Sequence, residues 1–129
     1  MHDSQFTMNR GMEMKSEKEN IILEKSFEFA CDLIDVYSKL TDLKFYRIAS
    51  QICGSGTSIG ANVREAQRAV STPDFTNKMS IALKEAEETE FWFELIERKI
   101  FPIELKLKQD LKSIIRILTT IIKTSKGKE

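Results

Sequence analysis

The residues best suited to chemistry in this 129-residue chain are basic and lie near its C-terminus. At about 100° of rotation per residue in an α-helix, they fall within about 80° of one another on one helix face. Such a face can follow the phosphates of a nucleic acid, and an oligomer repeats a field that is weak in one subunit. The alternative is an ordinary solvated face. The candidate nucleic-acid contacts are Lys108, Lys112, Arg116, Lys123 and Lys126.

A glycine-rich stretch, GSGTSIG at residues 54–60, invites comparison with phosphate-binding loops. Such a loop follows a strand and, in the Walker form, continues into Gly-Lys-Ser/Thr, but neither feature is present here. The stretch instead continues a helical apolar pattern. Each glycine costs a helix interior about 1 kcal/mol relative to alanine, so a helix that keeps glycines indicates close approach by a neighbour. The predicted close-packing positions are Gly56 and Gly60.

Carboxylates recur along residues 85–97. In a four-helix bundle, carboxylates that project from the helices into the core can hold two metal ions. A ferritin-like site also needs Glu-x-x-His pairs on two helices, and the only histidine in the chain is His2. No candidate general base lies beside a serine or cysteine in the sequence, so the nucleophile and base that acyl transfer requires are not evident. We therefore expect no enzyme activity, no catalytic residue, no metal site and no cofactor. A solvated acidic face is the interpretation for Glu85, Glu88, Glu90, Glu94 and Glu97.

The composition indicates one all-α domain as the scaffold for these side chains. The chain has zero formal net charge, only two prolines, and no alternating β-branched run. Its longest apolar runs fall far below the about 20 residues that a membrane span requires, and the N-terminus does not resemble a signal peptide. We expect a cytoplasmic protein that has no membrane partner and keeps Cys31 and Cys53 as reduced thiols.

The apolar spacing predicts an antiparallel up-down-up-down four-helix bundle, because four amphipathic segments are joined by short connections. The domain spans residues 19–126 and follows a disordered arm at 1–18. Its helices are predicted at about 19–40, 43–70, 73–100 and 104–124.

Two connections carry helix-capping signals. Thr41 or Asp42 is the predicted cap of the second helix. Ser71 or Thr72 caps the third helix, and Pro73 suits its first turn. The predicted packed face of the second helix consists of Ile52, Ile59, Val63, Ala66 and Val70.

Apolar residues exceed what one bundle can cover. Those of the first helix span about half its circumference, wider than the roughly 100° stripe of a surface helix. The third helix carries a further apolar set away from its core face. Because exposed apolar patches commonly mark interfaces, we predict a homo-oligomer whose interface includes Ile81, Phe91, Trp92 and Leu95.

Three ordered blocks, SGTSIGANVREAQRA, DFTNKMSIALKEAEETEFWFELI and ILTTIIKTSK, resemble the bacterial family of 23S ribosomal RNA intervening-sequence proteins. The resemblance covers about residues 27–126. It implies an antiparallel four-helix bundle, often assembled as a ring-shaped homopentamer. The family is also similar to the accessory variability determinant of diversity-generating retroelements, a basic pentamer that binds nucleic acid and a reverse transcriptase.

Together these patterns favour a non-enzymatic oligomeric scaffold, accessory to RNA, DNA or a nucleic-acid enzyme. The alternative is a small-ligand-binding or catalytic bundle with a pocket between its helices.

Overall fold

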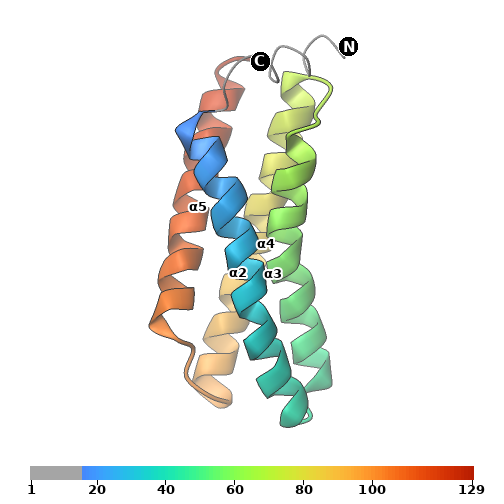
Figure 1. Ribbon diagram of the computed structural model, residues 1–129, viewed down its shortest axis with the longest axis vertical. Helices are drawn as coiled ribbons and strands as arrows, with labels where there is room; N and C mark the ends of the chain where they lie inside the picture. The colour runs from blue at the N-terminus through green and yellow to red at the C-terminus, as the bar shows by residue number, and fades with distance from the viewer. Residues whose placement is uncertain (1–15) are drawn as a thin grey trace.

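The structure, a computed structural model, describes residues 16–129 and contains four helices in this range. They are α2 (Glu17–Asp42), α3 (Tyr46–Ala66), α4 (Thr72–Lys99) and α5 (Leu105–Lys126). Consecutive helices run in opposite directions, and each of α2 and α4 packs against both α3 and α5 (Figure 1). The predicted all-α four-helix bundle is confirmed. Most of the predicted arm, residues 1–15, lies outside the described residues.

The first helix begins and ends at local signals. The Ser16 hydroxyl accepts a hydrogen bond from the backbone N–H of Glu19 at 3.1 Å, which satisfies one free donor of the first turn of α2. Beyond Asp42 the chain turns at Lys44, whose φ of 68° is incompatible with a right-handed helix. The predicted start of the second helix at residue 43 is therefore wrong, and so is the predicted cap, because Thr41 and Asp42 still belong to α2.

The connection between α3 and α4 is partly as predicted. The Ser71 hydroxyl accepts from the backbone N–H of Asp74 at 3.1 Å, so Ser71 is the cap of α4. The helix before it ends at Ala66 rather than at residue 70, because the next residues form a turn with shorter-range backbone hydrogen bonds. Val70 is consequently 64% exposed, and its predicted place on the packed face is wrong.

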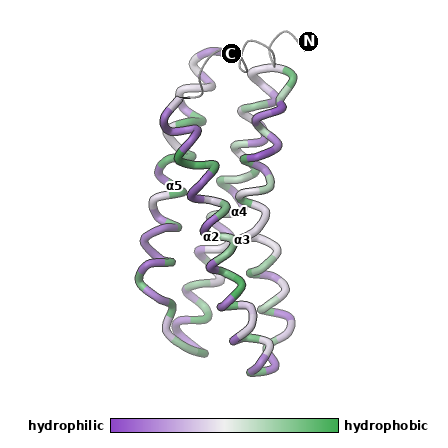
Figure 2. The backbone as a smooth tube through the Cα atoms, viewed as in Figure 1, coloured by the Kyte–Doolittle hydropathy of each residue, from purple (hydrophilic) through white to green (hydrophobic). Residues whose placement is uncertain are grey.

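One apolar core runs the length of the bundle, and hydrophobic positions alternate with hydrophilic ones along every helix (Figure 2). The four predicted packing residues of α3 that precede Val70 are fully buried. The largest fully buried side chains include Ile22, Phe29 and Leu33 of α2, Ile52 and Ile59 of α3, Met79 and Ile96 of α4, and Leu111, Ile114 and Leu118 of α5.

The glycines of α3 meet different surroundings. A Cβ at Gly60 would lie 3.3 Å from the backbone oxygen of Ser26, and a Cβ at Gly56 would overlap the Cδ2 atom of Leu33. Nothing lies within 4 Å of a Cβ built at Gly54. Gly56 and Gly60 thus face α2 at close range, whereas Gly54 faces open space.

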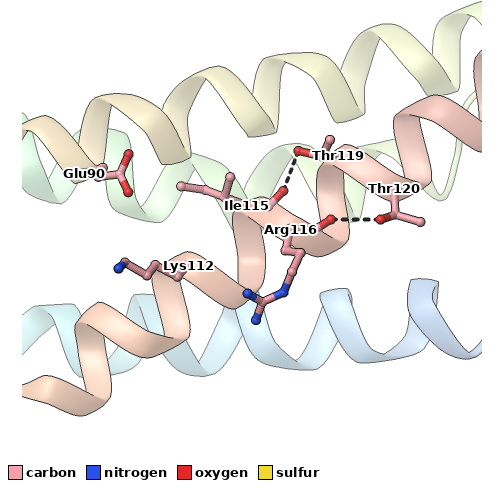
Figure 3. A pocket seen from close by; sticks show the side chains of 6 residues that line it. All are labelled: Glu90, Lys112, Ile115, Arg116, Thr119 and Thr120. Carbon is pink, nitrogen blue, oxygen red and sulfur yellow. Dashed lines mark hydrogen bonds between the residues drawn. The ribbon is translucent and has the colours of Figure 1, made fainter.

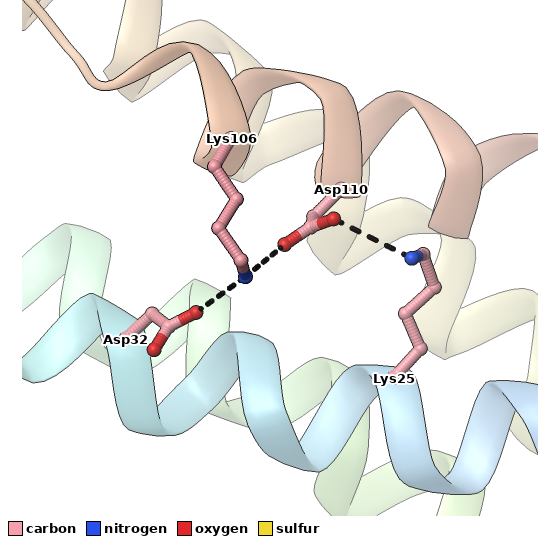
Figure 4. Close-up of polar contacts among 4 residues, drawn as sticks. All are labelled: Lys25, Asp32, Lys106 and Asp110. Atoms are coloured by element: carbon pink, nitrogen blue, oxygen red, sulfur yellow. Dashed lines mark hydrogen bonds and ion pairs between the residues drawn. The ribbon is translucent and has the colours of Figure 1, made fainter.

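Ion pairs bridge the seam between α2 and α5 (Figure 4). Lys106 Nζ lies 3.0 Å from Asp32 Oδ2 and 2.9 Å from Asp110 Oδ2. Lys25 Nζ lies 3.4 Å from Asp110 Oδ1. Partial burial works to raise the pKa of Asp110, but the hydrogen bond from Lys106 and the charge of Lys25 outweigh it and hold that pKa below its ordinary value. Hydrogen bonds to Asp110 and Asp32 raise the pKa of Lys106.

Within residues 16–129, no helix is both long enough and apolar enough to cross a membrane.

Candidate nucleic-acid interface on α5

Four of the five predicted basic contacts are free on the surface of α5. Lys112, Arg116, Lys123 and Lys126 are exposed, and none forms a hydrogen bond or ion pair with another described residue. We call these four residues the α5 stripe. The opposite side of the helix is committed to the core through Leu111, Ile114, Leu118 and their neighbours. The stripe therefore faces solvent or a partner.

The fifth predicted contact, Lys108, forms an ion pair with a residue of the same chain. Its Nζ lies 2.9 Å and 3.1 Å from the two carboxylate oxygens of Glu97 on α4. The hydrogen bond from Lys108 and a second one from the backbone N–H of Ile103 lower the pKa of Glu97. The lysine charge is therefore matched at the α4–α5 contact and adds little to the free positive charge of the α5 stripe.

Two members of the α5 stripe also line a pocket between α4 and α5 (Figure 3). The pocket has a volume of about 420 Å³ and is open to solvent. Its lining consists of Glu90 from α4 and Lys112, Ile115, Arg116, Thr119 and Thr120 from α5. The site thus combines two cations, one carboxylate and an apolar side chain.

The threonine hydroxyls of the pocket have a defined polarity. Thr119 Oγ1 donates to the backbone oxygen of Ile115 at 2.7 Å, and Thr120 Oγ1 donates to that of Arg116 at 3.1 Å. Because each hydroxyl proton is engaged with the helix, these oxygens can act toward a ligand only as acceptors. The donors of the pocket are the side chains of Lys112 and Arg116.

The predicted interface residues of α4 divide into two classes. Ile81 and Phe91 are 39% and 55% exposed. Trp92 and Leu95 are half-buried, and the Trp92 ring packs against the core and meets Phe91 edge-on at 5.1 Å between ring centroids. These four residues form what we call the α4 patch. Its most accessible large side chain is Phe91.

A second apolar surface lies on α2, and it contains Phe27, Ile34 and Tyr37, which are 54%, 49% and 38% exposed. We call these three residues the α2 patch. The Arg64 guanidinium of α3 lies over the Phe27 ring at 5.4 Å from its centroid, so the patch adjoins α3. The wide apolar arc predicted for this helix therefore has one part in the core and another on the surface.

Metal ligands do not assemble in the described part of the chain. Among residues 16–129, no group of three or more His, Cys, Asp or Glu side chains could hold a metal ion. Cys31 is exposed and Cys53 half-buried, and both are free thiols. His2 lies outside the described residues.

Comparison with known proteins connects this fold to a family. The family model of the 23S rRNA-intervening sequence protein matches residues 18–124. The chain belongs to this family. It is also similar to a crystal structure from Bacteroides thetaiotaomicron described as a protein with unknown function from the S23 ribosomal protein family. The two share 43% sequence identity with a TM-score of 0.76, over 82% of this chain and 98% of the other. No curated protein matches the chain.

Membership in the 23S rRNA-intervening sequence family confirms the resemblance seen in the three sequence blocks, but it assigns no activity. The sequence analysis allows for a pocket between helices but does not predict its place or its lining, because the pattern assigns Glu90 to a solvated acidic face and its position near Ile115 depends on the α4–α5 packing. Spacing alone offers one hint: Glu90 and Glu97 are seven residues apart and so lie on the same face of α4.

Proposed function

We propose that this protein is a non-enzymatic, homo-oligomeric scaffold of the cytoplasm that binds RNA or DNA along the α5 stripe, as an accessory to a nucleic-acid enzyme. The observation that carries the proposal is the set of four exposed cations on one helix face, none of them paired with a described residue. Free cations attract phosphates because binding releases condensed counterions. The neighbouring Lys106 and Lys108, both ion-paired, contribute little to this field.

The α2 and α4 patches support self-association. Single exposed apolar residues are normal, but groups of them commonly mark interfaces. The exposed members of the two patches are Phe27, Ile34 and Tyr37 on α2 and Ile81 and Phe91 on α4. These two patches lie on helices that occupy diagonal positions, since α2 and α4 each pack against α3 and α5 (Figure 1). A contact between the α2 patch of one copy and the α4 patch of the next is head-to-tail, and such contacts close into a ring when the rotation permits.

A ring gives the α5 stripe its effect. One copy offers about four phosphate contacts, which is weak at physiological salt. Several copies on one strand raise the avidity without any new contact, provided that the stripes engage the strand together. The family resemblance favours five subunits.

The proposal is tested by titrating the intact oligomer with labelled single-stranded RNA and DNA over a range of salt concentrations. We expect salt-sensitive, largely sequence-independent affinity, with log K falling against log salt with a slope of about −3 for each copy engaged. The double variant Lys112→Glu/Arg116→Glu removes two contacts per copy and opposes the rest, so binding should be lost at about 50 mM salt, where such contacts are strongest.

The matched control is Arg47→Glu/Lys84→Glu, which makes the same change in net charge on α3 and α4. Both positions are exposed and have no hydrogen-bond or ion-pair partner among the described residues. This control should keep its mass and its affinity. Equal losses in the two variants would indicate a general charge effect. No retention of either nucleic acid by the unaltered oligomer would overturn the proposal.

The pocket between α4 and α5 favours a second candidate, a bundle that binds a small ligand between its helices. Its volume of about 420 Å³ is within the 300–1,000 Å³ of ordinary ligand sites. A thermal-shift screen separates the two functions. Stabilisation by a small molecule, in a protein that retains no RNA or DNA, would establish the second candidate.

A further inference from the structure

We propose that the pocket between α4 and α5 receives one unpaired base of a single-stranded nucleic acid, while Lys112 and Arg116 hold the adjoining phosphate. This inference rests on the proposed function and deepens it, because it names the part of the strand that the pocket takes.

The charged side chains along the α4–α5 seam are paired at one point and unpaired at another. Glu97 and Lys108 form an ion pair, with 2.9 Å between Lys108 Nζ and Glu97 Oε2. Two turns earlier on α4, Glu90 lines the pocket together with Lys112 and Arg116 of α5 (Figure 3). None of these three side chains has a hydrogen bond or ion pair with a described residue. The seam thus leaves charges of both signs open to one cavity, where they can bind a ligand that carries donors and a negative group.

The lining and volume of the pocket restrict the shape of that ligand. The Ile115 side chain packs against the core and gives the pocket an apolar surface, which suits the face of an aromatic ring. The volume of about 420 Å³ exceeds the needs of a phosphate alone. The ligand is therefore a flat group attached to an anion, which describes a nucleotide.

The hydrogen-bonding groups of the pocket restrict which base can bind. Glu90 and the hydroxyl oxygens of Thr119 and Thr120 are acceptors, so they favour a base that carries amino donors. Cytosine and adenine present such donors, whereas uracil has no amino group. In a duplex these edges are paired and stacked, so the pocket requires an extruded or single-stranded base.

The test compares oligo(C), oligo(A) and oligo(U) RNA of equal length, with a C·G duplex as the paired form. We expect the wild-type protein to bind oligo(C) or oligo(A) about tenfold more tightly than oligo(U), since one well-matched base contact discriminates by about 1–3 kcal/mol and about 1.4 kcal/mol is a factor of ten. Glu90→Ala should remove most of the preference and leave oligo(U) binding equal or stronger, because it removes the charged acceptor of the pocket and leaves only the hydroxyl oxygens of Thr119 and Thr120.

Glu87→Ala is the matched control, because Glu87 is an exposed carboxylate of α4 outside the pocket lining. It should keep the base preference. Free CMP and UMP serve as competitors in a further experiment. Neither nucleotide should displace labelled oligo(C) as effectively as unlabelled oligo(C) of the same length does.

The outcomes separate this inference from the proposed function. If no oligonucleotide binds, the proposed function fails and the inference falls with it. If all bind equally, if the preference survives Glu90→Ala undiminished, or if the duplex binds as tightly as the single strand, the α5 stripe still binds phosphates but the base site is overturned. CMP binding without oligonucleotide binding also overturns the strand as occupant and favours the small-ligand candidate.

Discussion

The three glycines of α3 show how strongly a residue's effect depends on its neighbour. Each weakens the helix by a comparable amount, because glycine loses more backbone freedom than alanine when the helix forms. Only Gly56 and Gly60 offset this cost with an approach to α2 that a side chain would obstruct. Gly54 has no such contact within the single bundle.

The glycines give a pair of opposite predictions. Gly54→Ala should stabilise the protein by about 0.5–1 kcal/mol, because it improves helix propensity in open space. Gly60→Leu should destabilise it by about 1–3 kcal/mol or more, because the new side chain meets the Ser26 backbone. Urea melts of both variants measure the difference. A destabilising Gly54→Ala would mean that another copy covers α3 at this point.

Lysine pairing is a second effect at the residue scale. Lys108 and Lys112 are both lysines and lie one helical turn apart, so the sequence does not distinguish them. In the structure Lys108 forms an ion pair with Glu97, whereas Lys112 has no ion-pair partner among the described residues. The set of unpaired cations on α5 is consequently smaller than the sequence pattern indicates. It lies toward the C-terminal part of the helix.

At the scale of elements, the helices are joined by different means. Buried hydroxyls link α3 to α4 through Ser55 and Thr89, and α4 to α5 through Thr76 and Ser125. The α2–α5 seam carries the ion pairs among Lys25, Asp110, Lys106 and Asp32 (Figure 4). The α2–α5 seam should therefore respond to pH, as should the Glu97–Lys108 pair between α4 and α5.

The acid response has a definite sign. The folded pKa of Asp110 lies below its unfolded value, so its contribution to stability is present above about pH 4 and is lost as pH falls through the folded pKa. Lys106 has a raised pKa and keeps its charge throughout this range. Asp110→Asn should lower the melting temperature at pH 7 and flatten its fall between pH 4 and 2.

Asp35→Asn is the control for this prediction, because Asp35 is an exposed carboxylate of α2 without an ion pair among the described residues. Melting curves by circular dichroism at matched ionic strength measure both variants. An Asp110→Asn protein with the same acid profile as the unaltered one would show that the seam does not govern the acid response.

The assembly belongs to the scale of the whole molecule. If the α2 patch of one copy covers the α4 patch of the next, Phe91→Glu should dissociate the oligomer, because a charge replaces an apolar contact. Light scattering should then fall from a multiple of 14.9 kDa, five-fold in the favoured assembly, to the single-chain mass. Phe91 is a cleaner site than Trp92, whose ring also packs against the core.

Leu105→Glu is the control, since Leu105 is 64% exposed but lies outside both patches. Mixing Phe27→Glu with Phe91→Glu tests the head-to-tail arrangement. Each variant keeps the patch that the other has lost, so the mixture should form one-to-one dimers and no rings. A monomeric unaltered protein at micromolar concentration, or a ring that survives Phe91→Glu, would contradict this arrangement.

Much of the fold was predictable because local physics determines it. Apolar periodicity identified the four helices, and the Ser71-Thr72-Pro73 signal located the start of α4, since caps and proline restrict the backbone within one turn. The break before α3 was less predictable. It depends on the positive φ of Lys44, a residue type that gives no warning of that conformation.

The sequence by itself determined the helical pattern, the position of the cations on one face of α5, and the family. Each of these depends on spacing along one helix or on ordered sequence blocks. Only the tertiary structure decided which cations are free, which glycines touch α2, and that Glu90 lines a pocket together with Ile115 and Lys112. These properties depend on the register between antiparallel helices, which is set by the packing of many side chains distant in sequence.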